Sequence, residues 1–372
     1  MGETKSCSSE LQTVCASCTP AHEADMCLPR LNQAFVDGVV QTPAGPAPRV
    51  SSAFLWQDRL GIVKARWGVG RMHYTVDPGL YALGNPDKRS PVLVTANYKM
   101  SFDALRAALP NRNVWILVLD TKGINVWCAA GKGTFGTQEL VNRIKASNLP
   151  QIVSHRELIV PQLAGPGVAA HEVKRLSGFK VIYGPIEATD LPSFLDKGLK
   201  ATATMRLKTF TTRERAVLIP VELIPALKAG LIAVALFFLV SFLERGGQSL
   251  ASALNHTLFS GLAILTAIVA GAVLTPLLLP WLPGRAFSLK GFSVGLVLAV
   301  IFLVIQKSYR LEAIAWFFLI PSFAAYLAMN FTGASTYTSL SGVKREMRQA
   351  LPLEIGAAVV GLGLWIVSHI VV

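Results

Sequence analysis

The run VWILVL, at residues 114–119, decides the fold of the first half of this chain. Six consecutive apolar residues predict a strand that is buried on both faces of a sheet. Related runs predict further strands at residues 91–98 (PVLVTANY), 157–160 (ELIV) and 180–183 (KVIY). Because helical patterns separate these runs, they indicate a parallel sheet that is covered by helices on both faces.

The helices expected between these strands carry start signals in the sequence. They are predicted at 102–109 after a Ser101 cap, at 138–146 after a Thr137 cap, at 167–176, and from an Asp190 cap to residue 195. In open α/β sheets, ligands bind at the carboxyl ends of the strands. Here these ends are Thr95–Asn97, Asp120–Thr121 and Gly184–Pro185.

Composition divides the 372 residues into three parts. Residues 1–50 contain five prolines and few periodic apolar positions, so we expect a poorly ordered tail. Residues 51–205 form the α/β domain. The whole chain is 52% hydrophobic and only 15% charged, against roughly a quarter charged in soluble proteins, so residues 206–372 are expected to lie in lipid.

Five apolar stretches of about 20 residues predict transmembrane helices at 222–243, 257–282, 286–305, 312–331 and 353–372. With the soluble domain in the cytoplasm, nine basic residues lie inside (Arg206, Lys208, Arg213, Arg215, Arg285, Lys290, Lys344, Arg345, Arg348). Three then lie outside (Arg245, Lys307, Arg310). This asymmetry predicts a multi-pass protein of the cytoplasmic membrane. Sparse intramembrane charge favours an anchor over a transport path. The net charge of +13 favours anionic lipid and acidic partner proteins over nucleic acid.

The five cysteines fall into two groups. Cys7, Cys15, Cys18 and Cys27 lie in the tail, whereas Cys128 stands alone. An odd count without a small secreted framework indicates reduced thiols in the cytosol. The pair Cys15 and Cys18 either captures a soft metal or is idle.

The stretch NVWCAAGK, at residues 125–132, carries the chemistry. Asn125 is a good N-cap for a short helix over 126–130, which Gly131 and Gly133 then end. Cys128 lies in the first turn, where helix amides and the nearby Lys132 favour a thiolate, either a nucleophile or a soft-metal ligand. The alternative is a buried cysteine that only packs. The frame of a phosphate-binding loop is absent, because residue 126 is Val.

All eight residues of NVWCAAGK match the cap-helix signature of the HgcA family, and the chain therefore resembles these mercury-methylating corrinoid proteins of anaerobic microbes. The likeness covers about residues 60–372. The soluble part is also similar to the corrinoid iron–sulfur protein of the acetyl-CoA pathway. The fold that this implies is an α/β Rossmann-like corrinoid-binding domain, followed by an α-helical transmembrane domain of five helices.

The resemblance implies a role for each part of the motif. Cys128 would be the axial thiolate ligand of cobalt in a cobalamin-type corrinoid, above a floor formed by Val126, Ala129 and Ala130. Asn125 and Trp127 would hold this helix at its start and Lys132 at its end, with Gly131 and Gly133 beside the phosphate-bearing tail of the cofactor. The strand-end rule adds cofactor contacts at Thr95, Ala96, Asn97, Gly184, Pro185 and Ala188.

No histidine of this chain lies in the D-x-H-x-x-G pattern that usually supplies the lower ligand, so Cys128 is the best-placed soft donor. The implied reaction is methyl transfer from a Cys-ligated methyl-corrinoid to mercury(II), by a carbanion or a radical route. The implied partners are a ferredoxin-like protein with two 4Fe–4S clusters (HgcB) and a methyltetrahydrofolate-dependent methyl donor system. Two alternatives stay open: a membrane-anchored methyl carrier for another acceptor, and a sensor that binds a soft metal without catalysis.

Overall fold

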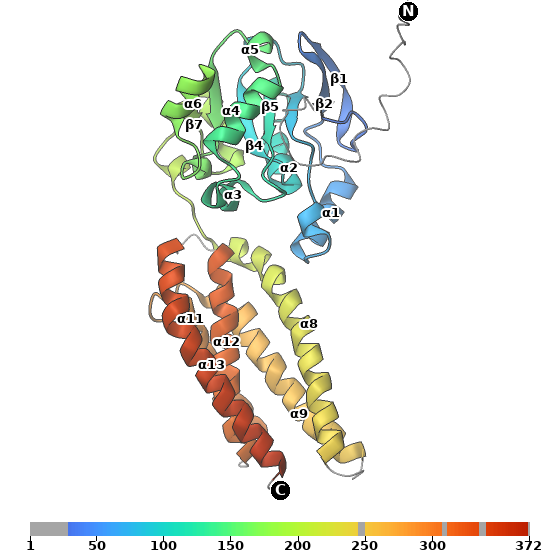
Figure 1. The fold of residues 1–372 in the computed structure, drawn as a ribbon, viewed down its shortest axis with the longest axis vertical. Coiled ribbons are helices and arrows are strands. Elements are labelled where there is room, and N and C mark those ends of the chain that lie inside the picture. Colours follow the sequence, from blue (N-terminus) through green and yellow to red (C-terminus); the bar gives the residue numbers. More distant parts are fainter. Residues whose placement is uncertain (1–28, 245–249, 307–310, 335–339, 371–372) are drawn as a thin grey trace, which may run out of the picture. The chain divides into compact units, whose positions relative to one another are not determined.

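The computed structural model describes residues 29–244, 250–306, 311–334 and 340–370, which fold into two compact units (Figure 1). The α/β unit comprises the described residues up to Phe54 together with Thr75–Ala201. The helical unit comprises Leu55–Tyr74 together with the chain from Thr202 onward. Each unit has a hydrophobic core of its own.

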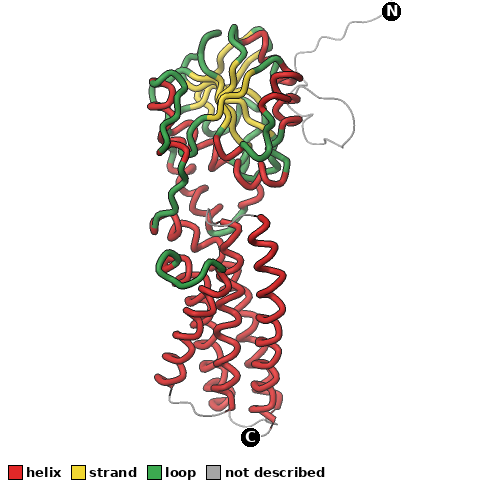
Figure 2. The backbone as a smooth tube through the Cα atoms, turned by 90° about the vertical axis from the view of Figure 1, so that its left-hand side faces the viewer, coloured by secondary structure: helices red, strands yellow, loops and turns green. Residues whose placement is uncertain are grey.

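Among the described residues, the α/β unit contains a seven-stranded mixed sheet in the order β1-β2-β3-β5-β4-β6-β7. The strands are β1 (Val36–Thr42), β2 (Gly45–Val50), β3 (Gly79–Leu83), β4 (Val92–Ala96), β5 (Val114–Leu119), β6 (Glu157–Val160) and β7 (Lys180–Tyr183). Strands β5, β4, β6 and β7 are parallel, so their carboxyl ends meet at one edge. Strand β3 is antiparallel to β5, and the β1–β2 hairpin extends the sheet beyond β3. Figure 2 shows the strands at the centre of this unit, with helices and loops around them.

Helices cover both faces of the sheet. They are α2 (Lys99–Ala107), α3 (Val126–Lys132), α4 (Thr137–Ala146), α5 (Leu149–Ile152), α6 (Ala170–Ser177) and α7 (Leu191–Asp196), with short 3-10 turns η2 (Gln162–Ala164) and η3 (Ala188–Asp190). Helices α4, α5 and α6 bury their apolar side chains on one face, together with strand residues such as Leu117. Helix α2 covers the other face, where the rings of Phe102 and Tyr81 lie 5.2 Å apart.

Sequence patterns located the central strands well and the first strands not at all. Three of the four predicted strands end where expected, and the fourth is shortened to β4. Residues 36–50 form β1 and β2, so the expectation of a poorly ordered tail is wrong for this segment. The prolines of β2 are tolerated because β2 pairs with β3 only at Arg49 and Val50, so Pro46 and Pro48 lie where that side of the strand needs no N–H donor. The sheet is mixed, rather than wholly parallel as was expected, because β3 runs antiparallel to β5 and β1 runs antiparallel to β2.

Two predicted helix caps are also wrong. Helix α2 begins at Lys99, so Ser101 lies inside it, and Gly136 rather than Thr137 precedes α4. The Thr137 hydroxyl instead accepts a hydrogen bond from the backbone N–H of Ala169, at 2.8 Å. Asp190 does precede α7, as predicted, although its side chain makes no capping hydrogen bond.

The helical unit holds, among the described residues, five helices that are long and apolar enough to cross a membrane. These spans are Thr212–Phe242, Ala253–Leu278, Phe287–Gln306, Leu311–Asn330 and Gly342–Ser368. They lie within α8 (Thr212–Glu244), α9 (Leu250–Ile268) with η5 (Val269–Leu274) and α10 (Thr275–Leu278), α11 (Phe287–Gln306), α12 (Leu311–Asn330) and α13 (Leu340–Ile370). The unit also contains α1 (Trp56–Arg66), η1 (Arg71–His73), η4 (Thr204–Arg206) and η6 (Phe331–Ala334). The prediction of five long apolar helices is confirmed for the described residues, and their insertion in a membrane stays a prediction.

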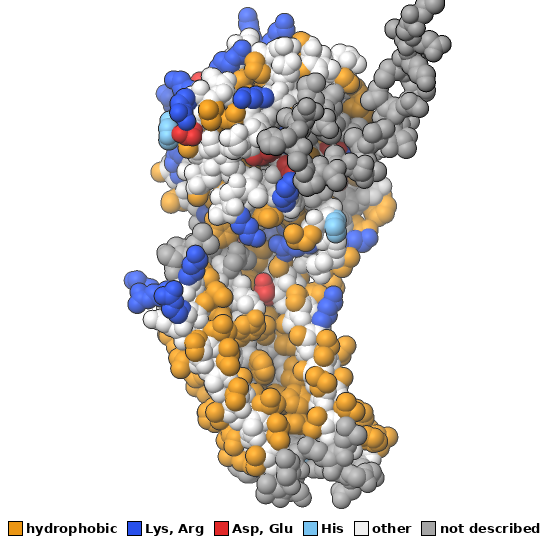
Figure 3. Space-filling model, viewed as in Figure 1, with side chains coloured by type: hydrophobic (Ala, Val, Ile, Leu, Met, Phe, Trp, Pro, Cys, Tyr) orange, Lys and Arg blue, Asp and Glu red, His pale blue; other side chains and the backbone are white. Residues whose placement is uncertain are grey.

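Small residues let the spans approach closely, as is usual for helices packed in a membrane. A Cβ atom on Gly291 of α11 would lie 2.5 Å from both the carbonyl oxygen of Ala324 and the Cβ of Ala328 in α12. Hydrophobic side chains cover the face of the helical unit seen in Figure 3, which suits contact with lipid rather than water.

Candidate cofactor-binding site

Helix α3 presents Cys128 in the geometry that its sequence predicts. The side-chain oxygen of Asn125 accepts a hydrogen bond from the backbone N–H of Cys128 at 2.9 Å, so Asn125 caps the helix as expected. The helix continues to Lys132, which places Gly131 inside it, and Gly133 ends it with a left-handed φ of 82°.

One side of α3 is packed against the α/β unit. Ala129 and Ala130 are buried and belong to the core beneath the sheet edge, and Ile124 and Val126 pack against the same core. The helix also contacts η2, which follows β6, and the strand β4. Cys128 therefore lies over the carboxyl ends of the parallel strands, which is where a ligand of such a sheet is expected.

Gly167 makes the close approach to α3 possible. A Cβ atom on this residue would lie 2.1 Å from the carbonyl oxygen of Phe135 and 3.0 Å from the Cα of Ala130. These are backbone atoms, which cannot swing aside as a flexible side chain can. The position therefore fixes the distance between α3 and the loop after β6, and only glycine fits.

The loop that leads into α3 is held by Asn97, at the end of β4. The Asn97 side-chain oxygen accepts hydrogen bonds from the backbone N–H groups of Thr121 (3.1 Å) and Gly123 (3.0 Å), and the Thr121 hydroxyl lies 2.8 Å from it. Lys122 and Gly123 both have positive φ, 58° and 70°, so this loop makes a tight turn. Asn97 is only 6% exposed, and its amide is thus used to shape the turn before α3.

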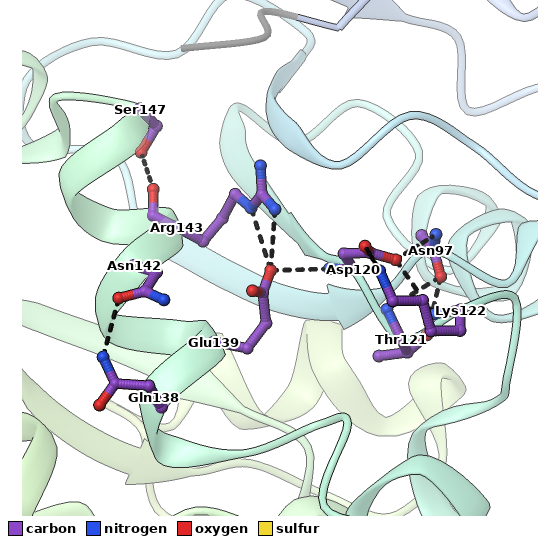
Figure 4. A network of polar contacts seen from close by, with 9 residues as sticks. All are labelled: Asn97, Asp120, Thr121, Lys122, Gln138, Glu139, Asn142, Arg143 and Ser147. Carbon is purple, nitrogen blue, oxygen red and sulfur yellow. Dashed lines mark hydrogen bonds and ion pairs between the residues drawn. The ribbon is translucent and has the colours of Figure 1, made fainter. Parts of the chain in front are cut away.

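A second polar network holds the same loop from the side of α4 (Figure 4). The carboxylate of Glu139 accepts hydrogen bonds from the backbone N–H of Asp120 at 2.9 Å and from the Arg143 guanidinium at 2.9 Å. The carboxylate of Asp120 pairs in turn with the Lys122 ammonium and lies 3.3 Å from the Asn97 amide nitrogen. Both ends of the turn are therefore anchored to regular elements of the domain.

The loop after η2 is fixed by two side chains. The Thr137 hydroxyl holds the N–H of Ala169, and the Tyr183 hydroxyl donates a hydrogen bond of 2.6 Å to the carbonyl of Val168. Partial burial of the Tyr183 hydroxyl raises its pKa above the ordinary value, so it remains a donor at physiological pH. This loop carries Gly167, and its fixed position therefore fixes the seat of α3.

The outward side of α3 is the part that a ligand can reach. The side chains of Val126, Trp127 and Cys128 are half-buried, and Gly131, Lys132 and Gly133 are exposed. The described residues hold no group of three or more His, Cys, Asp or Glu side chains that could bind a metal ion by themselves. Chemically, this surface can offer one soft sulfur donor on a rigid helix, flanked by a cation and by small residues.

The other predicted contacts lie at the same sheet edge but are less open. Thr95 and Ala96 are buried within β4 and pair with Val118 and Leu119 of β5. Gly184 and Pro185 are buried after β7, which is separated from β4 by β6, and Ala188 is half-buried at the start of η3. Their contact with a cofactor stays a prediction. The four cysteines of the tail lie outside the described residues.

Three residues that shape the site were not found from the sequence: Gly167, Glu139 and Tyr183. Gly167 was expected to begin a helix over 167–176, but α6 begins at Ala170, so Gly167 lies in the preceding loop, and its contact with α3 is long-range in sequence. In the sequence, Glu139 has the pattern of an ordinary helix residue, and Tyr183 that of an ordinary residue at the end of a strand. Only the fold brings their polar groups to the loops that flank Cys128.

Comparison with known proteins places this unit among relatives. Residues 69–195 match the family model described as CO dehydrogenase/acetyl-CoA synthase delta subunit. The acetyl-CoA decarbonylase/synthase complex subunit gamma of Methanopyrus kandleri is 33% identical over 124 residues, which cover 33% of this chain and 26% of the relative. The corresponding subunit of Methanothermobacter thermautotrophicus is 32% identical over 129 residues, or 34% and 28% of the two chains.

The matched segment thus spans little more than a quarter of the length of these relatives. The segment that matches the family model contains the strands β3 to β7, the whole of α3 and Cys128. Over about a third of its length, this chain is similar to subunits of acetyl-CoA decarbonylase/synthase complexes.

Proposed function

We propose that this protein binds a cobalamin-type corrinoid through Cys128 and transfers a methyl group from it to mercury(II), forming methylmercury. The observation that carries the proposal is the presentation of Cys128. Its sulfur belongs to a short helix that is capped by Asn125 and seated on Gly167, so the one cysteine thiol of the described residues is held at the ligand edge of the sheet.

The residues present fit such a cofactor. A cobalt corrinoid carries most of the ligands of its own metal, so it would need one donor from the protein rather than a cluster of side chains. Cys128 would supply that donor, and the three residues that follow it on α3, Ala129, Ala130 and Gly131, are small. When bound, the methyl-corrinoid supplies the methyl group, and mercury(II) is the substrate that accepts it.

The remaining residues hold and orient this donor. Asn97 fixes the turn before α3, and Asn125 binds the backbone N–H of Cys128 at the start of the helix. Together they fix the backbone position from which the Cys128 side chain extends. Trp127 and Lys132 are proposed to border the ring, with Val126 and Gly133 beside them. Further contacts with the cofactor are proposed at the strand ends, away from α3: Thr95, Ala96, Gly184, Pro185 and Ala188. A sulfur donor held by the protein would tune the metal centre of the bound cofactor, because the identity of the protein ligand is a main lever on reactivity.

The setting of this chemistry is proposed to be the cytoplasmic membrane. The α/β unit lies in the cytoplasm in this proposal, since the loops on that side carry the excess of basic residues. We expect reduction by a ferredoxin-like partner with two 4Fe–4S clusters (HgcB), because the four tail cysteines match no cluster spacing. A methyltetrahydrofolate-dependent system would restore the methyl group.

The test compares three purified proteins: the parent chain, Cys128→Ala, and a control in which Cys7, Cys15, Cys18 and Cys27 are all replaced by Ser. Cobalt content and methylmercury formation are measured for each. We expect about one cobalt per chain and activity in the parent and the control, and loss of methylmercury formation in Cys128→Ala. Methylation by Cys128→Ala at the parent rate would exclude the thiolate ligand.

A second function is favoured by the comparisons themselves. The names of the relatives place them in acetyl-CoA decarbonylase/synthase complexes, not in mercury metabolism. A membrane-anchored corrinoid protein that carries methyl groups to another acceptor fits the same site. The two functions separate in one assay: such a carrier would take up a labelled methyl group on a Cys128-dependent corrinoid, yet would release none of it to a mercury(II) dithiolate.

A further inference from the structure

A groove of about 920 Å³ lies in the helical unit, where α11 and α13 both pack against α12. Helix α12 lines it with the small residues Ser322 and Ala325. Helix α11 contributes Leu289 and Phe292, and α13 contributes Leu353. These three apolar side chains are 49%, 44% and 75% exposed, so the groove opens sideways to the medium that surrounds the spans, which is lipid.

Four charged residues also line this groove. Arg285 precedes α11 and Arg345 lies near the start of α13, and both side chains are exposed. Glu346 accepts a hydrogen bond from the backbone N–H of Ser288 at 2.6 Å. Glu354 differs from these three, because it lies further into the span Gly342–Ser368 and is buried, with only 9% of the residue exposed.

Neither carboxylate oxygen of Glu354 has a hydrogen-bond partner among the described residues. A buried polar group without a partner costs free energy, and more so if it is charged, so the position calls for a donor from outside the chain. Because Glu354 lines the groove, a ligand that enters from the lipid can supply that donor. In a membrane segment, such an acidic residue indicates a functional site.

The charges of the lining select the kind of ligand. Two guanidiniums and two carboxylates sum to zero, so the groove matches a head group that carries one negative and one positive charge. An anionic head group without a cation would leave Glu354 unpaired and repelled. We propose that the groove binds one phospholipid with a primary ammonium, of the phosphatidylethanolamine type. Its phosphate contacts Arg285 and Arg345, and its ammonium donates to Glu354.

The spacing along α13 agrees with this arrangement. Arg345 and Glu354 are nine residues apart, or about 13 Å along the helix axis. A flexible arginine side chain covers part of that span, and the head group covers the rest. The acyl chains would then lie along the apolar lining of α11 and α13, which is already exposed to lipid. This site is independent of the chemistry at Cys128.

Native mass spectrometry of the full chain in mild detergent tests the proposal. Phosphatidylethanolamine, phosphatidylglycerol and phosphatidylcholine are each added at equal concentration. We expect one phosphatidylethanolamine per chain, bound at least tenfold more tightly than either other lipid. Phosphatidylglycerol has the phosphate without the ammonium, and phosphatidylcholine has a cation that cannot donate a hydrogen bond.

Variants of the charged lining residues test whether the lipid binds in this groove. Glu354→Gln and Arg345→Gln should each weaken phosphatidylethanolamine binding about tenfold, which is the size expected for losing one charge-assisted hydrogen bond. Glu222→Gln is the matched control, because Glu222 is another carboxyl group within a span but does not line the groove, and it should bind like the parent. Glu354→Gln keeps the shape of the side chain and removes a buried charge, so folding should be retained. Equal binding of phosphatidylglycerol and phosphatidylethanolamine by the parent, or unchanged binding by Glu354→Gln, would overturn the proposal.

Discussion

Replacing Gly167 by Ala tests whether the seat of α3 controls the chemistry at Cys128. The added Cβ would lie 2.1 Å from the Phe135 carbonyl oxygen, whereas ordinary contact begins at 3.4 Å. The backbone atoms must therefore separate by about 1.3 Å to restore ordinary contact. Because Ala130 is also in contact at 3.0 Å, the separation moves α3 relative to the loop.

The size of the effect follows from this displacement. Overpacking of this kind costs about 1–3 kcal/mol of stability. A misplacement of about 1 Å in a reacting group can cost about 100-fold in rate. We therefore expect Gly167→Ala to fold with a modestly lowered unfolding temperature, to hold the corrinoid less tightly, and to form methylmercury at least about tenfold more slowly.

A neighbouring glycine provides the control. Gly165 lies in the same loop with a helical φ of −48°, and its Cβ would meet only the Gln162 carbonyl, at 3.3 Å. Gly165→Ala should therefore change stability by less than about 1 kcal/mol and leave the rate near that of the parent. Thermal unfolding, bound cobalt and methylmercury formation are measured for both variants. A Gly167→Ala protein as active as Gly165→Ala would refute the reasoning.

Three further predictions concern single side chains. Asn125→Ala removes the cap of α3 and should lower the free energy of unfolding by about 1 kcal/mol and speed the loss of corrinoid. Asn125→Ser should restore both the stability and the slow loss of corrinoid. Equal rates of corrinoid loss for the two variants would contradict the capping role. Asn97→Ala leaves two backbone N–H groups of the turn without their acceptor. The free energy of unfolding, measured by denaturant titration, should fall by about 2 kcal/mol or more. A change below about 0.5 kcal/mol would show that water replaces the amide. Burial raises the pKa of Tyr81 above its ordinary value of 10.0, so the neutral side chain stabilises the fold fully below pH 10.0 and this contribution falls as pH rises further. Tyr81→Phe should accordingly lose less stability than the parent between neutral pH and pH 11, and parallel pH profiles would argue against the shift.

The sequence predicted most of what local pattern determines. Four strands, five long apolar helices and the Asn125 cap all follow from runs of apolar residues or from one capping side chain. Their physical causes act within a few residues, so a single sequence reveals them. The bounds of the strand at residues 114–119 agree with the prediction. All six of its residues are buried, so the sequence shows one continuous apolar run.

The rest depends on contacts between distant segments. Strand β2 contains Pro46 and Pro48, which indicate a loop until the hairpin with β1 is known. Asn97 was expected to touch the cofactor, because it follows a strand, but its amide oxygen is used by the turn at Thr121 and Gly123. Gly167 gives no local signal for its contact with Ala130, 37 positions earlier in the chain.

The proposed bond between the Cys128 sulfur and cobalt is tested most directly by cobalt X-ray absorption of the purified, corrinoid-loaded full chain. We predict one sulfur scatterer in the first shell of cobalt in the parent and in the variant that lacks the four tail cysteines, and none in Cys128→Ala. A parent spectrum that requires only nitrogen and oxygen neighbours, or a sulfur neighbour that persists in Cys128→Ala, would contradict it.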